Sequence, residues 1–314
     1  MNTDSRIFVA GHKGMVGSAI LRALQKQKFN NIVTASRSDL DLTDSAAVDF
    51  FFEKNDIDLV YNAAAKVGGI VGNANYPGDY ILQNLSIQNN LFQASLKYSV
   101  SRHVFLGSCC IYPRDCPQPM KEKYILTGPL EPTNQPYAVA KISGIVTAQG
   151  LSKQYGMRTV CPMPINLYGP GDNWDPENSH IIPGLMRRFH FAKENGNPSS
   201  KVWGSGMVKR EYMHVDDCAD GIVFISDKFD NGEVVNIAPG VELTTRETAE
   251  SVAKIVGYEG QLVQDASKPD GTPRKWASPE VMTGIGWKPK IDFKEGLEST
   301  YDAFKASLGK GRGL

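Results

Sequence analysis

The chain has 314 residues, enough for one large domain or two of ordinary size. Its 34 basic and 34 acidic residues give a formal net charge of zero, which argues against nucleic acid as a partner. No apolar run approaches the roughly 18 residues that span a bilayer, so we expect no membrane partner.

Short apolar runs alternate with helical patterns through the first half of the chain. The predicted strands are residues 6–11, 31–37, 58–65, 103–108 and 159–169, and the predicted helices are 15–27, 45–55, 76–99 and 136–156. Strands that alternate with helices of this length predict parallel βαβ units, hence an α/β fold with a doubly wound parallel sheet. The runs are apolar on both faces, as buried parallel strands require.

The pattern changes after Pro164, where a loop rich in Gly, Pro, Asn and Asp is predicted. Further helices are predicted at 180–196, 214–227 and 244–258, with a strand at 234–238, and the remainder is expected to be loop-rich. Asp216 or Asp217 is the expected cap of the helix at 214–227. We predict a nucleotide-binding domain over 1–165, joined by about 215–238, and a smaller C-terminal domain over 166–214 and 239–314.

Three glycines, Gly11, Gly14 and Gly17, occupy the turn between the first strand and the first helix. The first permits a tight turn, the second lets the backbone approach a pyrophosphate, and the third lets helix and strand pack closely. This setting favours a dinucleotide-binding turn over a glycine-rich turn without a ligand. The cofactor-binding residues predicted on the turn are Gly11, Lys13, Gly14, Met15, Val16 and Gly17.

The residue about 20 positions after the turn indicates which dinucleotide is preferred. An acidic residue there binds the ribose of NAD, whereas Arg37 suits a 2′-phosphate through charge-assisted bonds. Lys13 supplies a second cation, so we predict NADP(H). The alternative is that Arg37 is a solvated surface residue and that Asp39 or Asp41 meets the ribose. Asp41 is therefore also a cofactor-binding candidate.

Tyr137 and Lys141 lie four positions apart on a predicted helix and share one face. A neighbouring ammonium favours the phenolate, which makes proton exchange by a tyrosine feasible near neutral pH. Ser108 ends a strand of the same sheet, where ligands collect, and its hydroxyl can polarise a carbonyl that is being reduced. These three residues predict a catalytic group for reduction of a ketone.

Two adjacent cysteines, Cys109 and Cys110, follow Ser108 in the string GSCCIYP. The five cysteines are odd in number and irregularly spaced, which argues against a disulfide framework and predicts a cytoplasmic protein. Adjacent cysteines lack the spacing of metal ligands, so no metal site is predicted. By itself, a free cysteine is most often a small buried hydrophobe. Residues 108 and 110 are expected to project the same way from the end of a strand.

Together, the glycine turn, the string NAAA at 62–65, Ser108 and the Tyr137-x-x-x-Lys141 pair resemble the extended short-chain dehydrogenase/reductase family. The resemblance spans essentially the whole chain and implies a Rossmann-type fold, a nicotinamide cofactor and a nucleotide-sugar substrate. It also implies cofactor contacts at Leu106, Lys141, Pro164, Asn166, Leu167 and His180. One departure is Lys13, which stands where related members carry arginine.

More specific strings, among them GSCCIYP, EPTNQPYAVAK, NSHIIP and DASKPDGTPRK, resemble one group within this family. That group inverts carbons 3 and 5 of GDP-4-keto-6-deoxy-D-mannose and reduces its carbon-4 ketone with NADPH. The resemblance implies Cys110 and His180 as the acid–base pair of the inversion, and we expect Cys110 as base and His180 as acid. The implied residues for the GDP-sugar are Arg188, Trp203, Arg210, Asp270 and Lys275, the last supplying charge near the diphosphate or keto-sugar.

Two other functions remain open from the sequence. A reductase of another GDP-4-keto-deoxyhexose or GDP-4-keto-heptose would keep the same motifs. A dinucleotide-binding sensor without catalysis would usually lose the tyrosine or the lysine, so the presence of Tyr137, Lys141, Ser108, Cys110 and His180 argues against it. The resemblance also implies a homodimer, formed through paired long helices.

Overall fold

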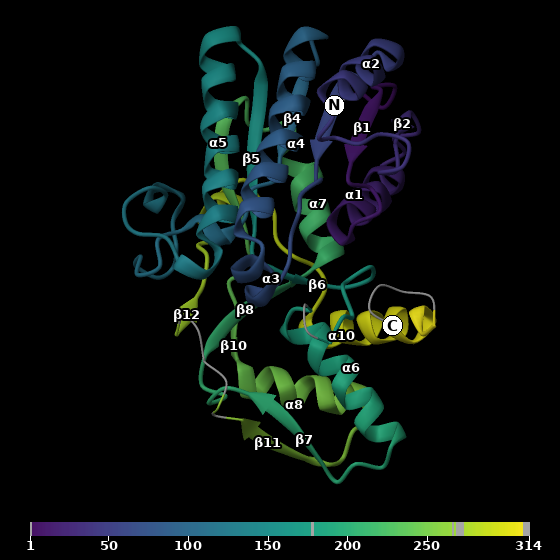
Figure 1. The fold of residues 1–314 in the computed structure, drawn as a ribbon, viewed down its shortest axis with the longest axis vertical. Coiled ribbons are helices and arrows are strands. Elements are labelled where there is room, and N and C mark those ends of the chain that lie inside the picture. The colour runs from purple at the N-terminus through teal and green to yellow at the C-terminus, as the bar shows by residue number, and fades with distance from the viewer. Residues whose placement is uncertain (1, 177–178, 266, 268–272, 310–314) are drawn as a thin grey trace.

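A parallel sheet forms the centre of the first part of the chain (Figure 1). The computed structural model describes residues 2–176, 179–265, 267 and 273–309, and within these ranges the sheet has six strands. In spatial order they are β2 (Ile32–Val33), β1 (Ile7–Ala10), β3 (Leu59–Asn62), β4 (Arg102–Phe105), β5 (Arg158–Pro164) and β9 (Asn231–Ile237). All of these neighbours pair in parallel, so the predicted α/β class with a doubly wound sheet is confirmed.

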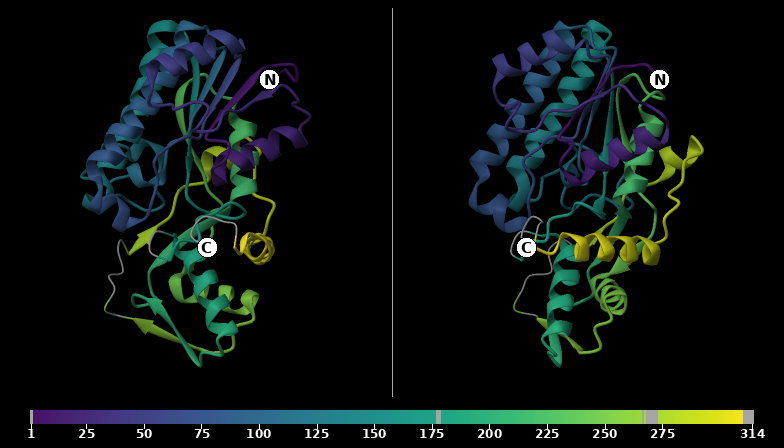
Figure 2. Two further views of the ribbon diagram at one scale, coloured as in Figure 1. Left: turned by 45° about the vertical axis from the view of Figure 1, so that its right-hand side comes forward. Right: turned by 90° about the vertical axis from the view of Figure 1, so that its right-hand side faces the viewer.

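Helices cover both faces of this sheet (Figure 2). The helices α2 (Ser45–Asn55), α4 (Pro77–Lys97) and α5 (Gln135–Tyr155) lie on one face, and α1 (Met15–Lys26) and α7 (Val215–Ile225) lie on the other. Shorter helices in the connections are α3 (Ile70–Asn75) and the 3-10 turns η1 (Cys109–Ile111), η2 (Glu122–Tyr124) and η3 (Pro132–Asn134). None of the helices in the described ranges combines the length and the apolar character needed to cross a bilayer.

The second part of the chain lies beyond the carboxyl ends of the parallel strands (Figure 1). Its strands are β6 (Asn166–Tyr168), β7 (Ser199–Trp203), β8 (Lys209–His214), β10 (Glu242–Thr244), β11 (Gln261–Asp265) and β12 (Arg274–Lys275). Its helices are α6 (Ile181–Glu194), α8 (Thr245–Val256), α9 (Glu280–Gly284) and α10 (Phe293–Ser307). Strand β8 pairs with β6, β10 and β12, and β7 pairs with β11. This part therefore faces the end of the sheet where ligands of such folds bind.

The predicted strand at 159–169 is wrong as a single strand. Strand β5 ends at Pro164, and after Ile165 the chain enters β6 and pairs with β8 in the other part. Both halves are apolar, so the pattern alone does not show that the chain leaves one sheet for another. The cap of α7 also differs, because His214 rather than Asp216 or Asp217 accepts the first free N–H.

The C-terminal region is more ordered than its composition indicates. The helix α10 lies in the part after residue 258 whose local composition predicts a loop-rich region. It forms because Asp292 caps it, accepting from the Glu295 N–H at 2.9 Å, and because Leu297 and Phe304 are buried against the second part. Tertiary packing therefore overrides the local preference.

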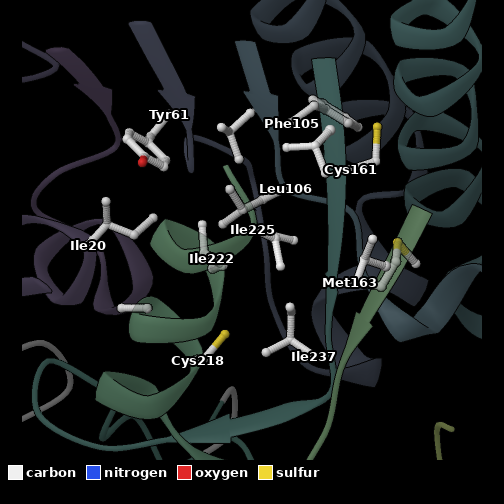
Figure 3. Close-up of a cluster of buried hydrophobic side chains, with 14 of the residues drawn as sticks. Ile20, Tyr61, Phe105, Leu106, Cys161, Met163, Cys218, Ile222, Ile225 and Ile237 are labelled. Carbon is white, nitrogen blue, oxygen red and sulfur yellow. The ribbon is translucent and has the colours of Figure 1, made fainter. Parts of the chain in front are cut away.

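Apolar side chains from helices and strands meet on the sheet face covered by α1 and α7 (Figure 3). Ile20 of α1 and Ile222 of α7 pack with Tyr61, Leu106 and Ile237 from three different strands or strand ends. The burial of these side chains fixes the carboxyl ends of β3, β4 and β9 relative to one another. The residues that follow these strands are thereby held in one place.

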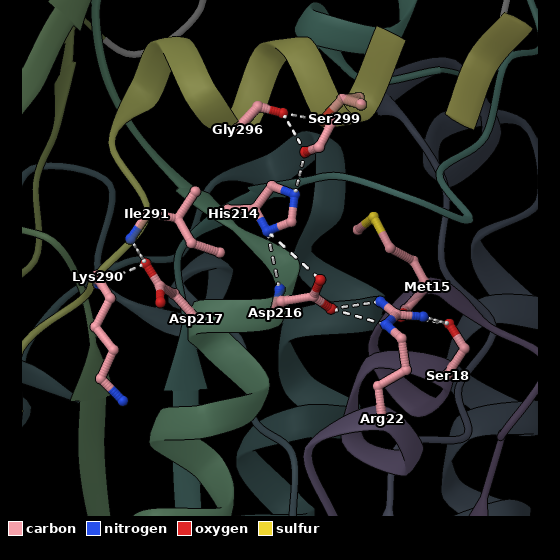
Figure 4. Close-up of polar contacts among 11 residues, drawn as sticks. Met15, Ser18, Arg22, His214, Asp216, Asp217, Lys290, Ile291, Gly296 and Ser299 are labelled. Carbon is pink, nitrogen blue, oxygen red and sulfur yellow. Dashed lines mark hydrogen bonds and ion pairs between the residues drawn. The ribbon is translucent and has the colours of Figure 1, made fainter. Parts of the chain in front are cut away.

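A polar chain connects α1 with the second part of the molecule (Figure 4). Arg22 of α1 donates to Asp216 through Nε at 3.0 Å. His214 accepts from the Asp216 N–H at 3.2 Å through Nδ1, which leaves Nε2 to hydrogen bond with Ser299 of α10 at 3.1 Å. The helix that follows the glycine turn is thus joined to the last helix described.

The close contact of α5 with the sheet depends on Gly144. A Cβ atom there would lie 2.2 Å from Phe105 Cζ, whereas a Cβ at Gly150 of the same helix meets no described atom within 4 Å. We expect Gly144→Ala to lower the free energy of unfolding by about 1–3 kcal/mol. Gly150→Ala should raise it by up to about 1 kcal/mol through helix propensity. Denaturant unfolding measures both, and equal stability of the two variants would show that Phe105 can move aside.

Candidate active site

The glycine turn after β1 is sterically closed to larger residues. Gly11 has φ +82°, and a Cβ on it would lie 2.8 Å from the Ala64 nitrogen. A Cβ on Gly17 would lie 2.2 Å from the carbonyl oxygen of Gly11. Gly14 donates its N–H to Gly11 at 2.9 Å and is the N-cap of α1, with no side-chain cap in the described part of the chain. The first N–H groups of α1, at Met15 and beyond, are thus open to a phosphate, and the site fits a dinucleotide.

The residues after β2 favour a phosphate over a bare ribose. Asp39 accepts from the Ser36 N–H at 3.2 Å, and Asp41 accepts from the N–H and hydroxyl of Thr43 at 2.9 and 2.8 Å. Both carboxylates are therefore engaged in local turns. Arg37 precedes both and is exposed, its charge acts on Asp41, and the charge of Lys13 acts on Asp39.

Asn62 at the end of β3 is buried, and its Oδ1 and Nδ2 have no hydrogen-bond partner among the described residues. A buried amide without a hydrogen-bond partner lowers the free energy of unfolding unless a ligand or a water molecule bonds to it. Its backbone oxygen accepts from the Leu106 N–H at 3.3 Å, so Asn62 lies where β3 and β4 end side by side. This orphaned amide is a second feature that fits a bound cofactor.

The strand ends also hold the residues expected along the nicotinamide. Leu106 follows β4, Pro164 ends β5, and Asn166 and Leu167 lie in β6. The backbone oxygen of Leu106 accepts a hydrogen bond from the Lys141 ammonium at 2.7 Å. The Asn166 side chain donates to the backbone oxygen of Glu211 at 2.9 Å, so that amide already has a partner.

Ser108, Tyr137 and Lys141 come together as predicted. The Ser108 hydroxyl makes a side-chain hydrogen bond with Tyr137, and Lys141 Nζ lies 6.0 Å from the centre of the Tyr137 ring. Burial raises the pKa of Tyr137, as does nearby Cys110, and both outweigh the hydrogen bond from Ser108. Burial lowers the pKa of Lys141 to about 8. The predicted preference for phenolate is therefore not found, and Tyr137 is held as a neutral acid.

The strand geometry expected for Ser108 and Cys110 is wrong, although the two residues do lie together. Strand β4 ends at Phe105, and Cys110 lies in the 3-10 turn η1 rather than in a strand. Ser108 caps this turn by accepting from the Cys110 N–H at 3.3 Å. A turn, not the alternation of a strand, brings Cys110 toward the serine.

Cys110 is set apart from ordinary buried cysteines by its surroundings. A hydrogen bond from Cys109 is the largest cause that lowers the pKa of Cys110; burial opposes it, and Lys275, Ser108 and His180 lower it further. The pKa of Cys109 is raised by the same hydrogen bond, by burial and by the negative charge of Cys110. These opposite shifts favour Cys110 as the member of the pair that ionises first.

His180 precedes α6 as its N-cap residue. The surrounding protein lowers its pKa, while the charge of Cys110 raises it. A lowered pKa makes the imidazolium scarcer at neutral pH but a stronger acid once it forms. The thiolate at Cys110 and the imidazole at His180 are thus electrostatically coupled, as an acid–base pair requires.

The candidate substrate residues come from the second part of the chain. Arg188 donates to the backbone oxygen of Lys201 at 2.6 Å and stacks 5.0 Å from the Trp203 ring centre, beside a cavity of about 260 Å³. Arg210 of β8 is the register partner of Lys275 in β12. Asp270 lies outside the described residues. A stacked guanidinium and two further cations suit a nucleoside diphosphate.

The sequence interpretation missed Glu211 in β8. Its side chain is fully buried, between the half-exposed Arg210 and Tyr212. The sequence offers one signal for it. The string KREYMH was not predicted as a strand, and if it is taken as one, Glu211 projects to the same side as the apolar Met213.

The family model described as "NAD dependent epimerase/dehydratase family" matches residues 7–238, which include the glycine turn, Ser108 and the tyrosine–lysine pair. The chain belongs to this family. The resemblance to extended short-chain dehydrogenases predicted from the motifs is thereby confirmed.

Curated members of the NAD dependent epimerase/dehydratase family match almost the whole chain. "GDP-L-fucose synthase 1" of Arabidopsis thaliana is 51% identical, covering 95% of this chain and 93% of that protein. "GDP-L-fucose synthase" of Escherichia coli is 47% identical over 99% of this chain and 100% of that protein. A solved GDP-mannoheptose C4 reductase from Campylobacter jejuni with NADP bound is 34% identical, with a TM-score of 0.88, over 97% and 99% of the two chains.

Proposed function

We propose that this chain converts GDP-4-keto-6-deoxy-D-mannose to GDP-L-fucose, inverting carbons 3 and 5 and reducing the carbon-4 ketone with NADPH. The observation that carries the proposal is the placement of Cys110 in the turn capped by Ser108, where the neighbouring cysteine, Lys275 and His180 lower its pKa and where Ser108 also acts on Tyr137. A simple reductase needs the hydroxyls but not a second acid–base pair. The GDP-L-fucose synthases, at 47–51% identity, support this reaction more than the heptose reductase does at 34%.

The inversion starts with proton removal from a carbon beside the ketone. Such a C–H bond is acidic only if the enolate oxygen is stabilised, and the hydroxyls of Ser108 and Tyr137 are placed together to donate to it. The Cys110 thiolate takes the proton, because Cys109, Lys275 and His180 lower its pKa and so favour the ionised form. His180 returns a proton from the other face of the ring, since inversion requires groups on both faces.

The reduction uses the same two hydroxyls. NADPH, when bound, supplies the hydride to carbon 4. Ser108 polarises the ketone, and the neutral Tyr137 phenol gives its proton to the oxygen that develops negative charge. The glycine turn and the N-terminus of α1 would hold the diphosphate, and Arg37 with Lys13 would hold the 2′-phosphate. Lys141 lies beside Tyr137 and would reach the ribose.

The two parts of the chain divide this work in our proposal. Residues 1–165 with about 215–238 bind the cofactor, and residues 166–214 with 239–314 bind the GDP-sugar. Trp203 and Arg188 give the nucleotide a flat cationic partner, and Arg210 gives a further charge to the diphosphate. We keep Asp270 as a sugar-binding candidate on the resemblance alone.

We also propose that the chain is a cytoplasmic homodimer. The outer faces of α4 and α5 expose Leu82, Val139, Val146 and Tyr155, with Leu82 66% and Val146 51% exposed. Two such helices from each copy would bury these apolar side chains in one interface. Sedimentation velocity of the purified chain tests the dimer, and a monomer at micromolar concentration would contradict it.

The function is tested by supplying GDP-4-keto-6-deoxy-D-mannose and NADPH and identifying the sugar product by NMR. GDP-L-fucose is the expected product, with one NADPH oxidised for each molecule formed. No oxidation of NADPH would refute the proposal. A product reduced at carbon 4 without inversion would favour a C4 reductase of the kind that acts on GDP-heptoses.

The cofactor preference is tested at Arg37. Arg37→Ala should weaken NADPH binding by about tenfold to a hundredfold, the loss of one charge-assisted contact, and leave NADH binding unchanged. Fluorescence titration of the purified variants measures both affinities. Arg246→Ala, which removes an exposed arginine of α8, is the control and should change neither. Equal losses for NADPH and NADH would show that Arg37 does not read the 2′-phosphate.

A further inference from the structure

Lys275, from the second part of the chain, lies within electrostatic reach of Cys110, and Arg210 and Glu131 act on Lys275 in opposite directions. Lys275 lowers the pKa of Cys110, and Cys110 is in turn the largest cause that raises the pKa of Lys275. Yet Lys275 belongs to β12, a strand of two residues that pairs with β8. A strand of two residues has few backbone hydrogen bonds, so further contacts are needed to keep the Lys275 side chain in place.

Glu211 provides a side-chain contact that holds this segment to β8, in addition to the backbone pairing of β12 with β8. Its side chain is fully buried, and its Oε2 accepts from the Ala277 N–H at 3.0 Å. Its Oε1 accepts from the Gly240 N–H at 2.7 Å. The carboxylate therefore ties two loop segments, those of Gly240 and Ala277, to strand β8. Ala277 is two residues after Lys275, and Glu211 directly follows Arg210, the register partner of Lys275.

The same segment is also attached to the loop that follows the two cysteines. Met120 donates its N–H to the Trp276 oxygen at 2.7 Å and accepts from the Ser278 N–H at 2.9 Å. The Gln118 side chain accepts from the Trp276 N–H at 2.9 Å. The chain from Lys275 to Ser278 therefore spans from β8 to the part that carries Cys110, and the Glu211 side chain reinforces its pairing on the β8 side.

Holding a carboxylate in this position is costly. Burial raises the pKa of Glu211 to about 7, although both backbone N–H groups oppose the shift. A buried charge of this kind adds little to stability compared with well-packed apolar side chains. The charge of Glu211 has a small direct effect that raises the pKa of Cys109, so loss of the charge alone would not raise the pKa of Cys110. Its two acceptor oxygens fix backbone atoms on either side of it.

We propose that Glu211 is a positioning residue for the inversion: by holding the segment Lys275–Ala277 to β8, it keeps the Lys275 ammonium beside the Cys110 sulfur. The proposal rests on the proposed function only for the role of Cys110 as a base. Glu211 touches neither the substrate nor the cofactor in it, and acts through Lys275.

The test measures the Cys110 thiolate directly, without substrate. Alkylation by iodoacetamide is followed against pH, and the label is assigned by mass spectrometry of the tryptic peptide 103–114, with fragmentation to separate Cys110 from Cys109. Lys275→Met should raise the midpoint by about one pH unit, because it removes a nearby opposite charge. Glu211→Gln, which replaces one acceptor oxygen with a donor, should shift the midpoint in the same direction.

The double variant separates positioning from a general effect. If Glu211 acts through Lys275, the double variant should have the midpoint of Lys275→Met alone, whereas independent effects would add. The matched control is Asp217→Asn, which alters another buried carboxylate that accepts two backbone N–H groups, from Lys290 at 2.9 Å and Ile291 at 2.8 Å (Figure 4). It should leave the midpoint unchanged.

An unchanged midpoint in a folded Glu211→Gln variant, or additive shifts in the double variant, would overturn the proposal. If Glu211→Gln does not fold, Glu211→Asp keeps the carboxylate but withdraws it by one methylene, and it should also raise the midpoint. A shifted midpoint in a chain that does not turn over GDP-4-keto-6-deoxy-D-mannose would support the positioning role and refute the proposed function.

Discussion

Replacing Cys110 with serine is expected to abolish the entry of solvent deuterium at carbons 3 and 5 of the sugar. A serine hydroxyl does not ionise near neutral pH, so the hydrogen bond from Cys109 and the charge of Lys275 no longer produce a base there. Loss of a positioned general base should lower the rate of GDP-L-fucose formation by roughly 10²–10⁴-fold. NMR of the sugar in heavy water measures exchange and product together.

Cofactor binding should survive this change, because the glycine turn and the Arg37 region lie on other strand ends. The control is Cys116→Ser, a half-buried cysteine of the same loop whose pKa is raised by burial, and it should keep full exchange. Deuterium incorporation at the wild-type rate in Cys110→Ser would exclude Cys110 from the mechanism.

Replacing Tyr137 with phenylalanine should remove the reduction more completely than the exchange. The neutral phenol supplies the proton that the carbon-4 oxygen takes up, so NADPH oxidation should slow by roughly 10²–10⁴-fold. Exchange at carbons 3 and 5 should fall less, because Ser108 still donates to the enolate oxygen. Stopped-flow loss of NADPH absorbance measures the reduction, and NMR in heavy water measures the exchange at carbons 3 and 5.

Tyr155→Phe is the matched control for this prediction. Tyr155 is the last residue of the same helix, α5, and is 55% exposed, so its hydroxyl contributes to neither step, and phenylalanine keeps the ring on the face proposed for the dimer. If Tyr137→Phe lost exchange and reduction in equal measure, the phenol would be an enolate donor first and the proton source for reduction only second.

The parts of the site that the sequence predicted are those defined by local spacing. Gly11, Gly14 and Gly17 occupy one turn, and Tyr137 and Lys141 lie one helical turn apart, so a short string contains the whole geometric requirement. The alternation of strands and helices likewise predicted the parallel sheet, because each strand and each helix is recognised from a short stretch of its own sequence.

The parts that the sequence did not predict depend on contacts between distant segments. Lys275 was expected near the diphosphate or sugar, and its effect on Cys110 arises only when β12 pairs with β8. The sequence does not distinguish Glu211 from the other acidic residues, because its burial depends on the fold. The direction of the Tyr137 pKa was also missed, because burial and the nearby Cys110, which a spacing of four residues does not reveal, both raise it.

The order of strands in the sheet has a consequence for synthesis of the chain. Strand β9 is the outer neighbour of β5, but most of the segment between them folds into the second part of the molecule. During translation, β5 therefore emerges as an apolar sheet edge that stays unpaired until residues 231–237 have also left the ribosome. An open edge of this kind invites pairing with other nascent chains. The interval between β5 and β9 is thus the stage at which this protein is most exposed to misassembly.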